Sequence, residues 1–236
     1  MESVFANHPT LTDRVYDLLQ NEILSGQASP GAQLEVVALA KRFGVSRTPV
    51  KEAVSRLIME GLVQDLPRRG YFVSKRDSED ISELLDARLM LELAAVEKGI
   101  EMAQPAEVAG MRRLLAEIDG IMDDQGWYVD YETFVRKDAE LHFAIVGTAR
   151  NRHLLDAYRR IFRHFHAARM HLALGPGYRR GIETRQDHLA IVLALEAKDR
   201  QGLRAAITKH LCDTKRWLTA AQAPAGDVAA GARSRA

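Results

Sequence analysis

The first third of the chain alternates short amphipathic segments with glycine and proline turns. Apolar residues recur every three or four positions, which is typical of helices that pack on one side. This spacing predicts helices over residues 11–25, 35–43 and 47–60, followed by β-prone runs at 62–66 and 71–74. The turn at 67–70 contains proline and glycine, so the two runs predict a hairpin. Three helices followed by a hairpin make a winged helix-turn-helix.

The junction between the second and third of these helices carries residues with specific backbone roles. Gly44 lies just past the second helix, where a left-handed residue is expected. Ser46 is the predicted N-cap of the third helix. Pro49 falls in the first turn of that helix, where a missing N–H breaks no intrahelical hydrogen bond.

From about residue 78 onward the spacing is helical, and no strand-like alternation appears. The predicted helices cover 78–102, 105–123, 130–148, 151–172, 180–197 and 199–220, with a break at Gly175-Pro176-Gly177. We therefore predict a mainly α protein with a winged helix-turn-helix over 8–76 and an all-α bundle of about six helices over 78–220. Residues 221–236 lack large apolar side chains, which indicates a disordered tail.

Composition narrows the class of protein. The chain is 47% hydrophobic and 28% charged, as in ordinary globular proteins. No run reaches the roughly 20 apolar residues of a membrane span, and the first residues lack the apolar core of a secretory signal. Cys212 is the single cysteine, so an internal disulfide is impossible. These features predict a cytoplasmic protein with no membrane partner.

Positive charge is concentrated in one segment, although the net charge of the chain is only +1. Residues 41–76 contain nine Lys and Arg against three Asp and Glu. Such a patch indicates either a polyanion-binding surface or a solvated charged face. In a helix-turn-helix the second helix of the motif enters the major groove, and this segment contains it. The candidate DNA contacts are Arg47, Thr48, Lys51 and Arg56 on that helix, and Arg69 and Gly70 at the hairpin tip.

Four polar residues fall on apolar helix faces in the second domain. Asp138 and His142 are four residues apart on one predicted helix, and His188 and His210 lie in phase with apolar residues on two others. A buried carboxylate without a partner is costly, and a divalent cation would remove that cost. Nitrogen and oxygen ligands suit Zn²⁺, Ni²⁺, Mn²⁺ or Fe²⁺ without selecting among them. The spacing also allows hydrogen-bonded core histidines and an ordinary surface Asp–His pair.

Arg88 also lies on an apolar face. An arginine that points inward needs an anion. An internal salt bridge to Glu92 or Asp138 would supply one.

The basic segment resembles a known family. The run Phe43-Gly44-Val45-Ser46-Arg47-Thr48-Pro49-Val50-Lys51-Glu52-Ala53, within residues 12–74, is similar to the N-terminal domain of GntR-family bacterial transcription regulators. The resemblance implies that Arg47, Thr48 and Lys51 contact operator bases or phosphates, and that Arg69 and Gly70 form the wing contact. Lys51 stands where the family often has arginine, which favours a simple ammonium contact over a bidentate one.

The second domain carries a further resemblance. The runs Asp138-Ala139-Glu140-Leu141-His142-Phe143, Asp187-His188-Leu189-Ala190-Ile191 and His210-Leu211 resemble the FCD ligand-binding domain of the FadR subfamily, over about residues 78–218. The resemblance implies that Asp138, His142, His188 and His210 hold a metal ion. It also implies that a small carboxylate effector completes the coordination and meets Arg88.

Together these features predict a homodimeric, metabolite-responsive transcription regulator that reads a pseudo-palindromic operator, with repression relieved by effector as the subfamily's default mode. We expect no enzymatic activity, because no glutamate is expected to face inward beside the site as a base and no nucleophile constellation is found. One alternative is a metal-dependent hydrolase or lyase fused to a DNA-binding module. The other is an operator binder with a purely structural metal.

Overall fold

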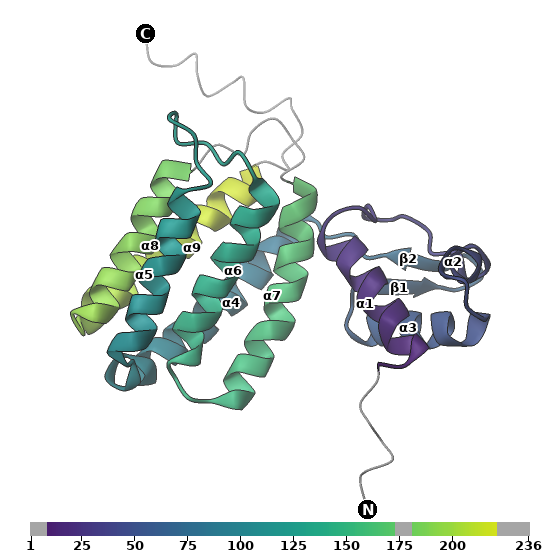
Figure 1. Ribbon diagram of the computed structural model, residues 1–236, viewed down its shortest axis with the longest axis horizontal. Coiled ribbons are helices and arrows are strands. Elements are labelled where there is room, and N and C mark those ends of the chain that lie inside the picture. The colour runs from purple at the N-terminus through teal and green to yellow at the C-terminus, as the bar shows by residue number, and fades with distance from the viewer. Residues whose placement is uncertain (1–8, 173–180, 221–236) are drawn as a thin grey trace, which may run out of the picture. The chain divides into compact units, whose positions relative to one another are not determined.

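The chain folds as two compact units that meet in sequence at Arg76 and Asp77. The computed structural model (Figure 1) describes residues 9–172 and 181–220. The glycine-proline break at 175–177 and the expected disordered tail at 221–236 lie outside the described residues. Among the helices that the structure describes, none combines the length and the apolar character needed to cross a membrane.

The first unit is a helix-turn-helix followed by a hairpin, as predicted. Its elements are α1 (Leu11–Leu24), α2 (Val36–Phe43), α3 (Arg47–Met59), β1 (Val63–Leu66) and β2 (Gly70–Val73). Helix α3 packs against α1, α2 and β1, so it lies at the centre of the unit. The two strands are antiparallel, with Val63 opposite Val73, and a bridge from Gln33 to Phe72 extends the pairing.

The turn between α2 and α3 has the predicted glycine. Gly44 adopts a left-handed conformation with φ of 66°, and its N–H donates to the carbonyl oxygens that end α2. Ser46 occupies the N-cap of α3, but its hydroxyl makes no capping hydrogen bond. The third helical residue is Pro49, which has no N–H to donate, so the usual bond from that position to the cap cannot form.

The second unit is a bundle of helices. Its elements are α4 (Ser78–Met102), α5 (Pro105–Asp119), α6 (Tyr131–Gly147), α7 (Arg152–Leu172), α8 (Gly181–Glu196) and α9 (Arg200–Ala220). Each helix contacts the next around a closed cycle, in the order α4, α9, α8, α5, α6, α7 and back to α4, and α4 also contacts α6 (Figure 1). Side chains that point into this cycle therefore converge from several helices.

Helix α5 ends earlier than predicted, at Asp119 instead of residue 123. Gly120 forms its C-cap, and the carboxylate of Asp123 accepts hydrogen bonds from the backbone N–H groups of Gln125 and Trp127. Such local bonds from an aspartate compete with helical hydrogen bonding and favour a turn. The helical spacing of apolar residues continues past Asp119, but the helical conformation of the backbone ends there.

Candidate functional site

Helix α3 presents a polar face to solvent opposite its buried side. Arg47, Thr48 and Lys51 are exposed, whereas Val50 and Val54 are fully buried. The four-residue spacing puts Arg47 and Lys51 on one face of the helix. Their contact with DNA stays a prediction, and this placement leaves both cations accessible to it.

Arg56 lies further along α3 and has an internal partner. Its Nη1 is 2.7 Å from Oδ1 of Asp13, and its guanidinium lies 4.1 Å from the ring centroid of Tyr16. The hydroxyl of Thr10 and then Arg56 lower the pKa of Asp13 to about 2. Arg56 therefore ties α3 to α1, and a phosphate contact for it stays a prediction that would have to compete with this pair.

The hairpin tip carries two exposed arginines on an unusual backbone. Arg68 has φ of 64° and Gly70 has φ of 96°, both in the left-handed region that glycine adopts easily and arginine rarely. The amide nitrogen of Gln33 donates to the carbonyl oxygen of Arg69 at 3.1 Å. The tip is thus held by the rest of the unit while the Arg68 and Arg69 side chains stay exposed.

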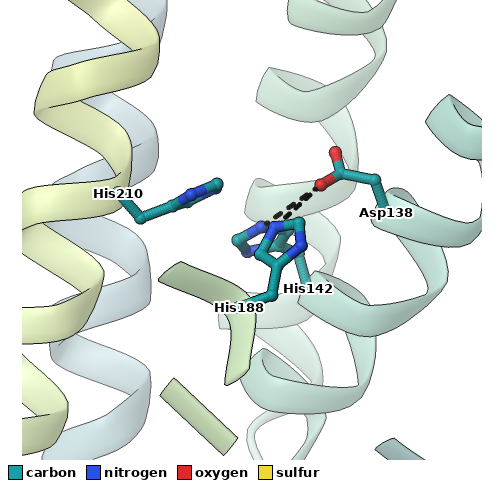
Figure 2. A group of neighbouring side chains, drawn as sticks. All are labelled: Asp138, His142, His188 and His210. Carbon is teal, nitrogen blue, oxygen red and sulfur yellow. Dashed lines mark ion pairs between the residues drawn. The ribbon is translucent and has the colours of Figure 1, made fainter. Parts of the chain in front are cut away.

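In the second unit the structure brings together all four residues of the predicted metal site. Asp138 and His142 come from α6, His188 from α8 and His210 from α9 (Figure 2). One ligand atom from each lies within 4.8 Å of the others, and all four residues are buried. The four-residue spacing of Asp138 and His142 places both on the same inward face of α6.

Within this cluster, several polar atoms lack hydrogen-bond partners. Nε2 of His188 is 3.0 Å from Oδ1 of Asp138, and Nε2 of His142 is 3.8 Å from the same oxygen. Among the described residues none of these three atoms makes a hydrogen bond of acceptable geometry. Each buried polar atom left unsatisfied costs about 1–3 kcal/mol. A cation at their centre would remove this cost, so the side chains present fit a divalent metal ion.

The protonation states of the cluster suit metal binding. Burial lowers the pKa of His210 to about 3, and the neighbouring His188 adds to this effect. Burial, followed by the charge of Arg88, also lowers the pKa of His142. Burial by itself would raise the pKa of Asp138, but Arg169 and then His188 hold it well below its usual value. Neutral imidazoles and an ionised carboxylate are the forms that coordinate metals.

Arg88 points inward, as predicted, and the internal salt bridge exists. Its Nε donates to Oε1 of Glu92 at 2.8 Å and to the hydroxyl of Tyr158 at 3.0 Å, and the side chain is fully buried. Its Nη2 has no hydrogen-bond partner among the described residues. Glu92 and Tyr158 therefore occupy Nε of the guanidinium, and in the described part of the chain the N–H groups of Nη2 remain available to donate to an anion.

The expectation that no glutamate faces inward beside the site is wrong. Glu92 is fully buried, and its Oε2 lies 3.0 Å from Nδ1 of His142. Burial by itself would raise the pKa of Glu92, but its interactions with His142 and Arg88 lower it, so the group is a carboxylate. Its position seven residues after Leu85 and four after Arg88 is the helical signal that could have identified it.

Arg169 is a second buried arginine that the sequence reasoning did not single out. Its Nη1 donates to Oδ2 of Asp138 at 2.5 Å, and its Nε donates to the hydroxyl of Tyr131 at 3.0 Å. Arg169 occurs four residues after Phe165 and eleven after Tyr158, on the same inward face of α7. This helical spacing relative to Phe165 and Tyr158 was the sequence signal that could have identified Arg169 as buried. Because Arg169 binds Oδ2, it is Oδ1 of Asp138 that faces the histidines.

Comparisons with known proteins find a matching family model for each of the two units. The chain matches the family model described as "Bacterial regulatory proteins, gntR family" over residues 11–73, and the FCD domain over residues 83–213. It is 31% identical over 140 residues to the Nta operon transcriptional regulator of Aminobacter aminovorans, which covers 59% of this chain and 64% of that protein. It is 26% identical over 156 residues to the HTH-type transcriptional repressor GlaR of Escherichia coli (strain K12), covering 62% and 67%. The solved structure of E. coli McbR/YncC has the same fold, with a TM-score of 0.76 at 23% identity, covering 89% of this chain and 97% of that one.

Proposed function

We propose that this chain, which belongs to the gntR family of bacterial regulatory proteins and carries an FCD domain, binds DNA with an affinity set by a small carboxylate held beside a metal ion. The family and the relatives are transcription regulators and not enzymes, so the chain is a DNA-binding transcription regulator. The alternative of a hydrolase or lyase is therefore set aside. What is proposed is the ligand, the metal and the direction of the response.

The metal would be held by Asp138, His142, His188 and His210. Three imidazole nitrogens and one carboxylate oxygen suit Zn²⁺, Ni²⁺, Mn²⁺ or Fe²⁺. When bound, such an ion supplies positive charge that can polarise and hold a carboxylate. The protein's own part is to bury the cluster, to keep the imidazoles of His142 and His210 neutral, and to keep Asp138 ionised.

The effector would be a small organic acid whose carboxylate meets Arg88. The observation that carries this proposal is the unpartnered Nη2 of Arg88, a cation that is fully buried in the same hydrogen-bonded network as His142. Charged hydrogen bonds to a carboxylate are among the strongest available to a buried guanidinium. An acid that contacts both Arg88 and the metal would satisfy this atom.

Operator binding would use the first unit of each protomer in a cytoplasmic homodimer. Arg47, Thr48 and Lys51 would lie in the major groove, with Arg69 and Gly70 at the backbone or minor groove. A two-fold dimer fits a pseudo-palindromic operator. We propose repression relieved by the acid, supported by the relative that is named a repressor. The acid can change operator affinity only if it binds one conformation of the protein better than another.

Thermal melting with defined acids tests this proposal. Full-length protein loaded with Zn²⁺ or Ni²⁺ is melted with acetate, lactate, succinate or citrate, and again after treatment with a chelator. An acid at 100 times its Kd should stabilise by about 2.7 kcal/mol, which raises Tm by roughly 5–11 °C. The shift should vanish with chelator and in His188→Ala. It should persist in His153→Ala, which removes an exposed histidine from α7.

The remaining candidate function is an operator binder with a purely structural metal. In that case the chelator would lower Tm, but no acid would raise it in the metal-loaded protein, and the sensor proposal would fail. The direction of the response is tested with duplexes selected from a random-sequence library by the full-length protein. Release of the selected duplex by the stabilising acid supports relief of repression, and tighter binding contradicts it.

A further inference from the structure

Glu92 is a buried carboxylate that links two parts of the site. Its Oε1 accepts hydrogen bonds from Nε of Arg88 at 2.8 Å and from the hydroxyl of Tyr158 at 2.7 Å. Its Oε2 lies 3.0 Å from Nδ1 of His142. Each oxygen therefore has a different neighbour, with Arg88 and Tyr158 on one side and His142 on the other.

This arrangement dictates which nitrogen of His142 carries the proton. A carboxylate can only accept hydrogen bonds, so Nδ1 of His142 must be the donor. In the neutral ring Nε2 then keeps its lone pair. Nε2 is the atom that faces Oδ1 of Asp138, at 3.8 Å, inside the four-residue cluster.

The other two histidines of the cluster lack an equivalent hydrogen bond in the described part of the chain. Nδ1 of His210 is 3.7 Å from Oδ2 of Asp187, beyond hydrogen-bonding distance. Nδ1 of His188 has no hydrogen-bond partner among the described residues. Of the three histidines, His142 thus has the shortest contact between Nδ1 and a carboxylate outside the cluster.

We infer that Glu92 is a positioning residue that fixes His142 in the Nδ1–H tautomer and so presents Nε2 to the metal. The inference rests on the proposed function in taking the cluster as a metal site. Carboxylates that hold a ligating histidine in this way typically change metal affinity by 10–100-fold when they are removed. Arg88 holds the carboxylate at the oxygen that His142 does not use, and Tyr158 is a second donor to that same oxygen.

The substitution Glu92→Gln tests this inference directly, because it is expected to reverse the tautomer of His142. Arginine can only donate, so Oε1 of the new glutamine should face Nε of Arg88. Its NH₂ group would then face Nδ1 of His142, which must become an acceptor. The proton would move to Nε2 and block the nitrogen that faces the cluster. Tyr158→Phe is the matched control, because it removes another hydrogen bond to Glu92 and leaves the carboxylate beside His142.

The test reads the tautomer and the metal affinity separately. Full-length protein labelled with ¹⁵N-histidine and freed of metal is studied by long-range ¹H–¹⁵N correlation, with His142→Gln identifying the signals of that ring. We expect the Nδ1–H form in wild type and Tyr158→Phe, and the Nε2–H form in Glu92→Gln. Zn²⁺ affinity, measured by competition with a chromogenic chelator, should fall at least 10-fold in Glu92→Gln and less than threefold in Tyr158→Phe.

An Nε2–H tautomer in the wild-type protein would overturn the inference without any variant having to fold. An unchanged tautomer and unchanged Zn²⁺ affinity in folded Glu92→Gln would overturn it as well. Wild-type protein that binds no Zn²⁺ would instead refute the metal site of the proposed function, while the tautomer in metal-free protein would still decide what Glu92 does to His142.

Discussion

The pair between Arg169 and Asp138 gives the most quantitative prediction. Both side chains are almost fully buried, and Nη1 of Arg169 lies 2.5 Å from Oδ2 of Asp138. The substitution Arg169→Met keeps a long side chain but leaves a buried carboxylate without its cation. Breaking a buried pair in this way typically costs about 3–5 kcal/mol. For a domain of this size that corresponds to a fall in Tm of roughly 6–20 °C.

The chain contains a matched surface pair as a control. Nε of Arg185 lies 2.5 Å from Oδ1 of Asp119, the same separation, but both side chains are more than a third exposed. Solvent screens such pairs, so Arg185→Met should cost at most about 1 kcal/mol, or roughly 4 °C. The two pairs have the same N–O separation but differ strongly in burial, which is the variable that the prediction tests, and Arg169 additionally donates to the hydroxyl of Tyr131.

The assay uses the two tryptophans of the chain, Trp127 and Trp217, which both belong to the second unit. Their fluorescence therefore reports melting of that unit alone, in chelator-treated and in metal-loaded protein. The loss in Arg169→Met should be smaller with metal, because the ion would compensate Asp138. If metal-free Arg169→Met melts within a few degrees of Arg185→Met, the reasoning about the buried pair is wrong.

Three further predictions concern DNA, metal and pH. Arg47→Ala should abolish specific operator binding in a gel-shift assay while helical circular dichroism is unchanged, with Arg159→Ala as a surface control; retained specificity would remove Arg47 from the interface. His188→Ala should lower metal content in elemental analysis, and unchanged stoichiometry would exclude it as a ligand. Because the pKa of His210 falls to about 3 on folding, the unfolded state binds a proton below about pH 6.5 that the folded state rejects. Metal-free protein should therefore lose about 2 kcal/mol of unfolding free energy by pH 5 from His210. Urea titrations should show a weaker pH dependence in His210→Asn, and an equal dependence would contradict the shift.

Local patterns were sufficient to predict most of the elements. The helix expected over 47–60 is Arg47–Met59, because the alternation of buried and exposed positions and the Gly44 turn are encoded within a few residues. The end of α5 was misplaced, because Gly120 caps the helix and the backbone beyond it forms a turn, held by hydrogen bonds to the carboxylate of Asp123 and from the Asp123 N–H to the carbonyl oxygen of Trp127.

Helical phase predicted which site residues are buried, but not which of them contact one another. Phase alone placed Asp138, His142, His188 and His210 on inward faces, since the direction of a side chain follows from its position in the helix. Phase also placed Arg88 inward but left its partner open. The bond to Glu92 depends on how α4 meets α6 and α7, because the same carboxylate also contacts His142 and Tyr158.

The sequence by itself determined which side of each helix is buried. It showed which residues point into the bundle, and which basic side chains on α3 point to solvent. Only the tertiary structure decided which inward groups meet. Arg169 and Asp138 are 31 residues apart, and Glu92 and His142 are 50 apart. Contacts across such separations depend on the packing of whole helices against one another, and the spacing of residues along any one helix does not specify which helices will meet or at which positions.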